Sequence, residues 1–286
     1  IGLMVVAMLV FAVQDAISLH LTTSYNVYVV VMIRYWFFAA FVMTVSAKQA
    51  GGLRNAAATQ QPFLQFGRGL LLALEICVMM TAFTFLGLVE SLALFTCYPL
   101  LVAALSGPIL GEAVGWRRWG AIAIGFVGVL FIIKPGIGVF SPYAAIPLIS
   151  ALMFALYSLL TRYAARKDTT ATSFFWTGAI GVVVMTSIGI FHWEVMQGRD
   201  YIWMAALCVS GATGHWMLIR IYELAEASVV QPFAYLHFAF AAVIGVLVFH
   251  EVVEPHVILG VAIVVFAGLF TLWRERQKTR QDEPTA

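Results

Sequence analysis

Residues 91–112 read SLALFTCYPLLVAALSGPILGE, and this stretch decides the class of the protein. It runs from Ser91 to Gly111 without a charged side chain. About 20 predominantly apolar residues suffice for a helix to cross the hydrocarbon core of a bilayer. The run is continuously apolar, whereas the strands of a membrane β-barrel alternate between apolar and polar residues. The stretch therefore predicts a transmembrane α-helix.

The rest of the chain has a similar composition. Of the 286 residues, 62% are hydrophobic and only 10% are charged, whereas about a quarter of the residues in a soluble domain are charged. Too few polar side chains remain to cover a surface that faces water. The net charge of +2 gives no electrostatic footprint for nucleic acid. We therefore expect an integral membrane protein whose surroundings are the lipid bilayer.

Further apolar runs of similar length precede and follow residues 91–110, separated by short turn-forming or charged segments. They predict an all-α polytopic membrane protein with ten transmembrane helices. The predicted spans are 2–21, 27–47, 68–88, 91–110, 117–134, 143–162, 171–191, 201–220, 228–249 and 256–273. Residues 274–286 remain as a basic tail.

The basic residues predict the orientation, because cytoplasmic loops carry an excess of Lys and Arg. Nine lie in the loops on the side that holds both termini, and the tail adds four more. Only two, Lys134 and Arg199, lie on the opposite side. We therefore expect a protein of the cell inner membrane with both termini in the cytoplasm.

An internal repeat divides the chain. The pattern GxxxxxFxG begins at Gly120 and again at Gly260, 140 residues later, and the pair Phe-Ala at Phe11 returns at Phe154. These matches predict two five-helix halves, residues 1–136 and 143–273. Because five is odd, the second half enters the membrane with inverted polarity, a plan that is frequent in secondary transporters.

The halves resemble the paired EamA-type units of the drug/metabolite transporter superfamily. The resemblance rests on Gly111-Glu112 with Pro99 thirteen residues earlier, on the second copy Ala227-Ser228 to His250-Glu251, and on the Gly-rich helix after each. The second copy departs from the pattern, since Phe238 stands where Pro is expected and His250 replaces a small residue.

Within the superfamily, the chain is most similar to bacterial ten-helix exporters of aromatic and neutral amino acids. The resemblance implies a central cavity lined mainly by the first, third, fourth, sixth, eighth and ninth helices. It also implies that the fifth and tenth helices pack the halves together.

Five ionisable groups lie inside predicted spans, where they are costly and therefore candidates for function. Asp15 and Arg34 lie at similar depth and could neutralise each other, either as a gate or as a structural pair. Glu75 could attract a substrate ammonium or carry a proton, or it could be a neutral acid bonded to a neighbouring helix. His215 and His237 could contact substrate or be hydrogen-bonded core residues.

Deep aromatic residues and prolines complete the candidates. The expected substrate-binding set joins Glu75, His215 and His237 to four aromatic residues, Tyr98, Tyr157, Trp216 and Tyr235. Pro99 and Pro232 are expected to act as hinges, because proline removes an intrahelical hydrogen bond and kinks a helix.

Enzyme chemistry has no motif to support it. The sequence contains no Walker loop, HExxH, GxSxG or paired catalytic carboxylates. Cys77, Cys97 and Cys208 lack the spacing of a metal site. We expect no enzyme activity, no cofactor and no metal.

The sequence thus predicts a transporter of small organic solutes that works by alternating access. Aromatic and neutral amino acids are the expected substrates, because the resemblance implies them and because aromatic and histidine residues suit a zwitterion with a large side chain. The span residues include no cluster of Lys or Arg, which argues against phosphate esters and nucleotide sugars. The alternative is proton-coupled efflux of cationic drugs or metabolites through Glu75. A pore or receptor is a third class, although no filter motif or signalling domain supports it. With two halves in one chain, a monomer would suffice, although a dimer is also compatible with the sequence, and the sequence does not identify a protein partner.

Overall fold

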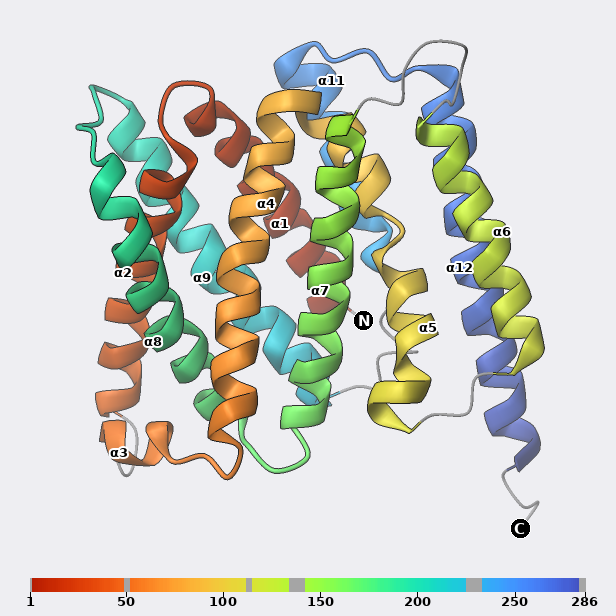
Figure 1. Cartoon of the computed structure of the whole chain (residues 1–286), viewed down its shortest axis with the longest axis horizontal. Coiled ribbons are helices and arrows are strands. Elements are labelled where there is room, and N and C mark those ends of the chain that lie inside the picture. Colours follow the sequence, from red (N-terminus) through yellow and green to blue (C-terminus); the bar gives the residue numbers. More distant parts are fainter. Residues whose placement is uncertain (1, 49–51, 112–114, 134–141, 225–232, 283–286) are drawn as a thin grey trace.

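The computed structural model describes residues 2–48, 52–111, 115–133, 142–224 and 233–282, and every regular element within these ranges is a helix (Figure 1). The first half of the chain contains α1 (Gly2–Thr22), α2 (Val27–Lys48), α3 (Gly52–Ala57), α4 (Pro62–Phe95), α5 (Tyr98–Leu110) and α6 (Trp116–Ile133). The second contains η1 (Pro142–Ala144), α7 (Ala145–Ala164), α8 (Thr170–Gly189), η2 (Ile190–His192), α9 (Asp200–Leu224), α11 (Leu236–Phe249) and α12 (Pro255–Asp282).

These helices make the chain a polytopic helical membrane protein. Six described segments are at least 18 residues long and apolar enough to cross a bilayer: α1, α2, α4, η1 with α7, α8 with η2, and α9. Four shorter apolar helices lie within α5, α6, α11 and α12. The count of ten crossings and the cytoplasmic placement of both termini stay predictions.

The chain turns alternately at two ends of the bundle (Figure 1). The short helix α3 and the α7–α8 connection lie at one end, which we call the α3 end. The α1–α2 and α8–α9 connections lie at the other, which we call the opposite end.

The boundary between the third and fourth predicted spans differs from the prediction. The sequence indicated separate helices over 68–88 and 91–110, whereas α4 continues from Pro62 to Phe95 with a break at Gly87. Gly87 has φ +77° and ψ −179°, a backbone conformation that glycine adopts without strain. The turn therefore needs one glycine rather than a polar loop.

A carboxylate from the second half of the chain caps this break. Glu251 accepts hydrogen bonds from the backbone N–H groups of Leu88 and Val89, at 2.8 and 2.7 Å. A Cβ on Gly87 would lie 2.9 Å from Glu251 Oε1. The glycine therefore supplies both the backbone conformation and the space for the cap.

Pro99 lies in the first turn of α5 rather than in the middle of a continuous helix. The preceding helix ends at Phe95, and the chain turns at Thr96 and Cys97 before α5 begins. Proline suits the first turn of a helix, where its missing N–H has no intrahelical partner to lose. The expected kink is therefore an interruption between two helices.

Gly111 and His250 end their helices in the same way. Each is the C-cap residue, of α5 and α11 respectively, and each has a left-handed backbone, with φ +79° at Gly111 and +56° at His250. They are 139 residues apart. Although His250 departs from the repeat pattern, it keeps the left-handed backbone of the helix end, a conformation that a non-glycine residue adopts at some cost in free energy.

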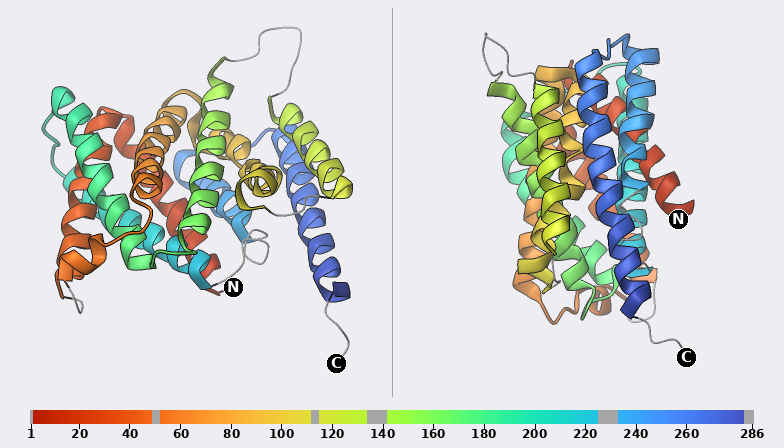
Figure 2. Two further views of the ribbon diagram at one scale, coloured as in Figure 1. Left: turned by 60° about the horizontal axis from the view of Figure 1, so that its bottom comes forward. Right: turned by 90° about the vertical axis from the view of Figure 1, so that its right-hand side faces the viewer.

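The helices α6 and α12 pack along each other at one side of the molecule, as the two views of Figure 2 show. Their contact is close because glycines face each other: a Cβ on Gly128 would lie 2.7 Å from the carbonyl oxygen of Gly260. Small residues allow such close approach between helices in lipid. The repeated Gly-rich patterns therefore meet in space.

Candidate functional site

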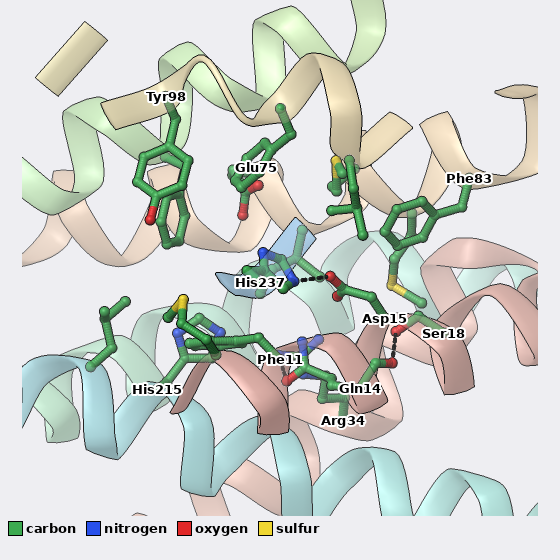
Figure 3. Close-up of a pocket in the computed structure, with 18 residues that line it drawn as sticks. Phe11, Gln14, Asp15, Ser18, Arg34, Glu75, Phe83, Tyr98, His215 and His237 are labelled. Carbon is green, nitrogen blue, oxygen red and sulfur yellow. Dashed lines mark hydrogen bonds and ion pairs between the residues drawn. The ribbon is translucent and has the colours of Figure 1, made fainter. Parts of the chain in front are cut away.

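A cavity lies between the two halves of the chain, with walls from α1, α2, α4, α5, α7, α9 and α11 (Figure 3). Its free volume is about 60 Å³, room for only a few water molecules. The polar lining residues are Gln14, Asp15, Ser18, Arg34, Glu75, Tyr98, His215 and His237, and the apolar ones are Met8, Phe11, Ile76, Met79, Met80, Phe83, Leu92, Phe95, Phe154 and Leu218.

Asp15 and His237 are in hydrogen-bonding contact across the cavity. Asp15 Oδ2 on α1 lies 2.8 Å from His237 Nε2 on α11, and both side chains are largely buried. The dashed line in Figure 3 marks this contact. A carboxylate from the first half and an imidazole from the second therefore meet at the wall of the site.

Arg34 does not pair with Asp15 in the way that their similar depths had suggested. Its Nη2 donates to Gln14 Oε1 at 3.1 Å, and the guanidinium is buried beside Gly211 of α9. Consecutive residues of a helix point about 100° apart. Gln14 therefore faces α2 while Asp15 faces α11, which separates the expected partners.

Glu75 is a second buried carboxyl in the cavity wall. It is 4% exposed, and its Oε1 accepts a hydrogen bond of 2.6 Å from Ser150 Oγ on α7. Ser150 thereby fixes one carboxyl oxygen. A cation in the cavity would meet carboxyl groups on two sides, from α1 and from α4.

Aromatic rings form a continuous wall. Phe11 lies 5.4 Å from the ring of His215 and 6.2 Å from that of His237, in edge-to-face arrangements. Phe95 continues the wall from His237 to Phe154, and Phe154 meets Tyr98 edge-on at 5.0 Å. Such rings offer both faces and edges to a flat ligand.

His215 has an unused hydrogen-bonding atom. Its Nδ1 is buried and finds no partner among the described residues. Buried polar atoms are nearly always paired in proteins, so an unpaired one beside a cavity is a point at which a ligand could bind.

Three of the residues expected to bind substrate lie away from the cavity, and one expected hinge cannot be placed. Tyr157 is fully buried and accepts a hydrogen bond from Arg68 at 3.3 Å. Trp216 faces a separate groove between α2, α8 and α9 and is 44% exposed. The Tyr235 hydroxyl packs against Gly268 of α12. Pro232 lies outside the described residues.

Sequence reasoning missed a buried polar cluster at the α3 end. Arg68, counted above as a loop cation, is 0% exposed, and Gln65 beside it is equally buried. Gln65 bridges Arg68 to Asp168. The available signal was the spacing of Gln65 and Arg68, which places both on one face of a helix.

Metal ligands are not gathered at this site: within the described residues, no group of three or more His, Cys, Asp and Glu side chains could hold a metal ion.

Comparison with known proteins identifies relatives of this chain. Residues 142–273 match the EamA-like transporter family. The chain is 23% identical to an S-adenosylmethionine uptake transporter of Rickettsia prowazekii, over 93% of this chain and 90% of the relative. It is 25% identical to a riboflavin transporter of Vibrio cholerae, over 99% and 96% of the two chains. A solved crystal structure shares the fold, with a TM-score of 0.67 at 15% identity over 94% of this chain and 95% of its own.

Proposed function

We propose that this chain, whose residues 142–273 match the EamA-like transporter family, moves a small organic solute through the cavity by alternating access. The matching family is described as transporters, and the relatives given above are named as transporters rather than enzymes. In this proposal residues 1–136 and 143–273 act as inverted halves in the cytoplasmic membrane, with both termini in the cytoplasm.

The substrate class that the cavity fits best is an amino-acid zwitterion joined to an aromatic ring system and a further cation, as in S-adenosylmethionine. The carrying observation is that the wall combines two carboxyl groups, one guanidinium and a continuous set of rings. The Rickettsia relatives are named for this solute.

Each part of such a solute has a complementary group. Its ammonium and sulfonium would face Asp15 and Glu75, which carry the acidic oxygens of the cavity. Its carboxylate would face Arg34, since guanidinium groups bind carboxylates well. Its purine would stack on the wall from Phe11 to Tyr98, and rings attract a neighbouring cation as well.

The small free volume supports alternating access. About 60 Å³ is far below the roughly 300 Å³ at which ligand-sized pockets begin. A solute of this size would enter only when the two halves move apart and would be enclosed when they return. Asp15, Arg34 and Glu75 would then exchange their present partners for the solute.

Aromatic and neutral amino acids are the second candidate, with export as the direction that the sequence resemblance implied. The supporting observation is the same combination of Arg34, a carboxyl group and rings, which also suits a zwitterion with an aromatic side chain. The names of the relatives given above point instead to S-adenosylmethionine and riboflavin.

Uptake into proteoliposomes tests the proposal. The purified chain would be assayed with labelled S-adenosylmethionine, riboflavin, tryptophan and phenylalanine, each with and without unlabelled competitor and with a pH gradient of either sign. Saturable uptake of S-adenosylmethionine that the unlabelled solute competes supports the proposal. Flux of tryptophan alone or of riboflavin alone would make that solute the proposed substrate instead. Movement of a cationic dye that requires a proton gradient would favour drug efflux.

A further inference from the structure

Two polar clusters tie the halves of the chain together, one at each end of the bundle. The α3-end cluster consists of Gln65, Arg68 and Asp168, and the opposite-end cluster consists of His20, Tyr25 and Asp200. Each joins residues before position 136 to residues after position 143. The cavity lies between the two ends.

The α3-end cluster is buried and heavily bonded. Gln65 Nε2 donates to Asp168 Oδ2 at 2.9 Å, and Gln65 Oε1 accepts from Arg68 Nη2 at 2.9 Å. The Asp168 carboxylate also accepts from Thr59 Oγ1 and from the backbone N–H of Gln60. Arg68 continues the network to α7 and α8 through Tyr157, Thr161, Thr177 and the carbonyl of Ser173.

The opposite-end cluster has fewer hydrogen bonds and is more exposed. The Tyr25 hydroxyl donates to Asp200 Oδ2 at 2.7 Å, and His20 Nε2 lies 3.4 Å from Asp200 Oδ1. The hydrogen bond to Asp200 raises the pKa of Tyr25 above its ordinary value. Exposed polar pairs of this kind contribute little to stability because water competes for them.

The clusters occupy equivalent places in the two predicted halves. Tyr25 lies in the connection before α2 and Asp168 in the connection before α8, and they are 143 residues apart, the offset that relates Phe11 to Phe154. Gln65 and Asp200 lie in the first turns of α4 and α9, which are the third long helices of their halves. In both clusters, the first connection of one half is thus bonded to the third helix of the other.

We propose that these clusters are two gate locks, related by the internal repeat, which break alternately as the cavity opens to one side of the membrane or the other. The inference rests on the proposed function. Because the α3-end lock is buried and has many bonds while the opposite-end lock is partly exposed and has fewer, the opposite end opens more readily when the cavity is empty.

Labelling of a cysteine in the cavity tests the locks without any solute, so its result does not depend on the identity of the substrate. Ser18 is buried in the cavity wall, and the native cysteines are buried as well. Ser18→Cys would be labelled with a membrane-impermeant maleimide, applied either to intact cells or to inside-out vesicles. Labelling of the chain without Ser18→Cys would be subtracted.

The lock variants are Asp168→Asn and Asp200→Asn. Loss of hydrogen bonds to a charged group is expected to raise the labelling rate by about tenfold, from the membrane face at the α3 end for Asp168→Asn and from the other face for Asp200→Asn. Lys167→Gln and Arg199→Gln change exposed neighbours of the two carboxylates and should leave both rates unchanged. Equal rates in lock and control variants, or increases from the same face, would overturn the proposal.

A cross-link provides a second test should Asp168→Asn fail to fold. Thr59→Cys with Asp168→Cys places two thiols where a hydroxyl and a carboxylate now bond. Oxidation should close the α3 end, so that labelling of Ser18→Cys from that face and solute transport both stop, and reduction should restore both. Continued labelling from that face in the cross-linked protein would contradict the role of this cluster.

Discussion

Asp15 Oδ2 and His237 Nε2 lie 2.8 Å apart, although 222 residues separate them in the chain. The carboxylate is on α1 and the imidazole on α11, so the contact joins the two halves at the cavity wall. A cationic solute that approaches Asp15 therefore competes with His237 for the same oxygen. Binding of the solute and release of a contact between the halves become one event.

Asp15→Asn should raise the KM for S-adenosylmethionine by about tenfold, because an uncharged amide binds a cation more weakly than a carboxylate does. His237→Gln should lower this KM or leave it nearly unchanged, since it removes the side chain that competes with the solute for Asp15. The measurement is initial uptake rate against concentration in proteoliposomes. An unchanged KM in Asp15→Asn would exclude this carboxylate from substrate binding.

Glu75→Gln should abolish saturable uptake of cationic solutes while the protein remains folded, because the amide oxygen can still accept the hydrogen bond from Ser150. Ser150→Ala is the matched control: it removes the hydrogen bond but keeps the carboxyl group, and it should retain transport with a changed KM. Size-exclusion chromatography and thermal unfolding would establish that both variants fold. Full activity in Glu75→Gln would leave this residue a structural role only.

Gly211→Ala should weaken recognition of the solute's carboxylate without changing any polar group. A Cβ at position 211 would lie 2.6 Å from Nε of Arg34, so the guanidinium must shift. The KM for S-adenosylmethionine should rise, whereas that for its decarboxylated analogue should not. An equal rise for both solutes would indicate general distortion of the cavity.

Gly128→Ala should destabilise the packing of α6 on α12 by about 1–3 kcal/mol, the usual cost of an overpacked contact, because its Cβ would press on the carbonyl of Gly260. Gly120→Ala on the same helix is the control, since a Cβ there meets nothing within 4 Å. Reversible unfolding in mixed micelles would compare them. Equal stability of the two variants would contradict the close helix contact.

The helices were predictable because continuous apolar runs leave few other structures in a membrane. The junction after Gly87 was not, since its cap comes from Glu251, and sequence spacing does not identify a partner 164 residues away. The same limitation applied to Asp15. Its depth in α1 was readable, but the choice between Arg34 and His237 depends on how α1 is rotated against its neighbours.

The structure brings four of the residues expected to bind substrate to one cavity. Glu75, Tyr98, His215 and His237 line it, and each was selected for ionisable or polar character inside an apolar span. Their role in binding stays a prediction. Trp216 and Tyr235 share that character but face away, because a helix that borders a cavity has other faces too. Arg68 was assigned to a loop because it lies near a predicted span end, where arginine is ordinarily solvated.

The cap at Gly87 also bears on biogenesis. Leu88 and Val89 are synthesised well before Glu251, and until Glu251 is in place their N–H groups lack the carboxylate that binds them. Backbone N–H groups that are buried without a hydrogen-bond partner are costly. The helix break in the first half is therefore capped only after the second half has been translated. Before that point, the nascent chain passes through an intermediate in which the break at Gly87 has no cap.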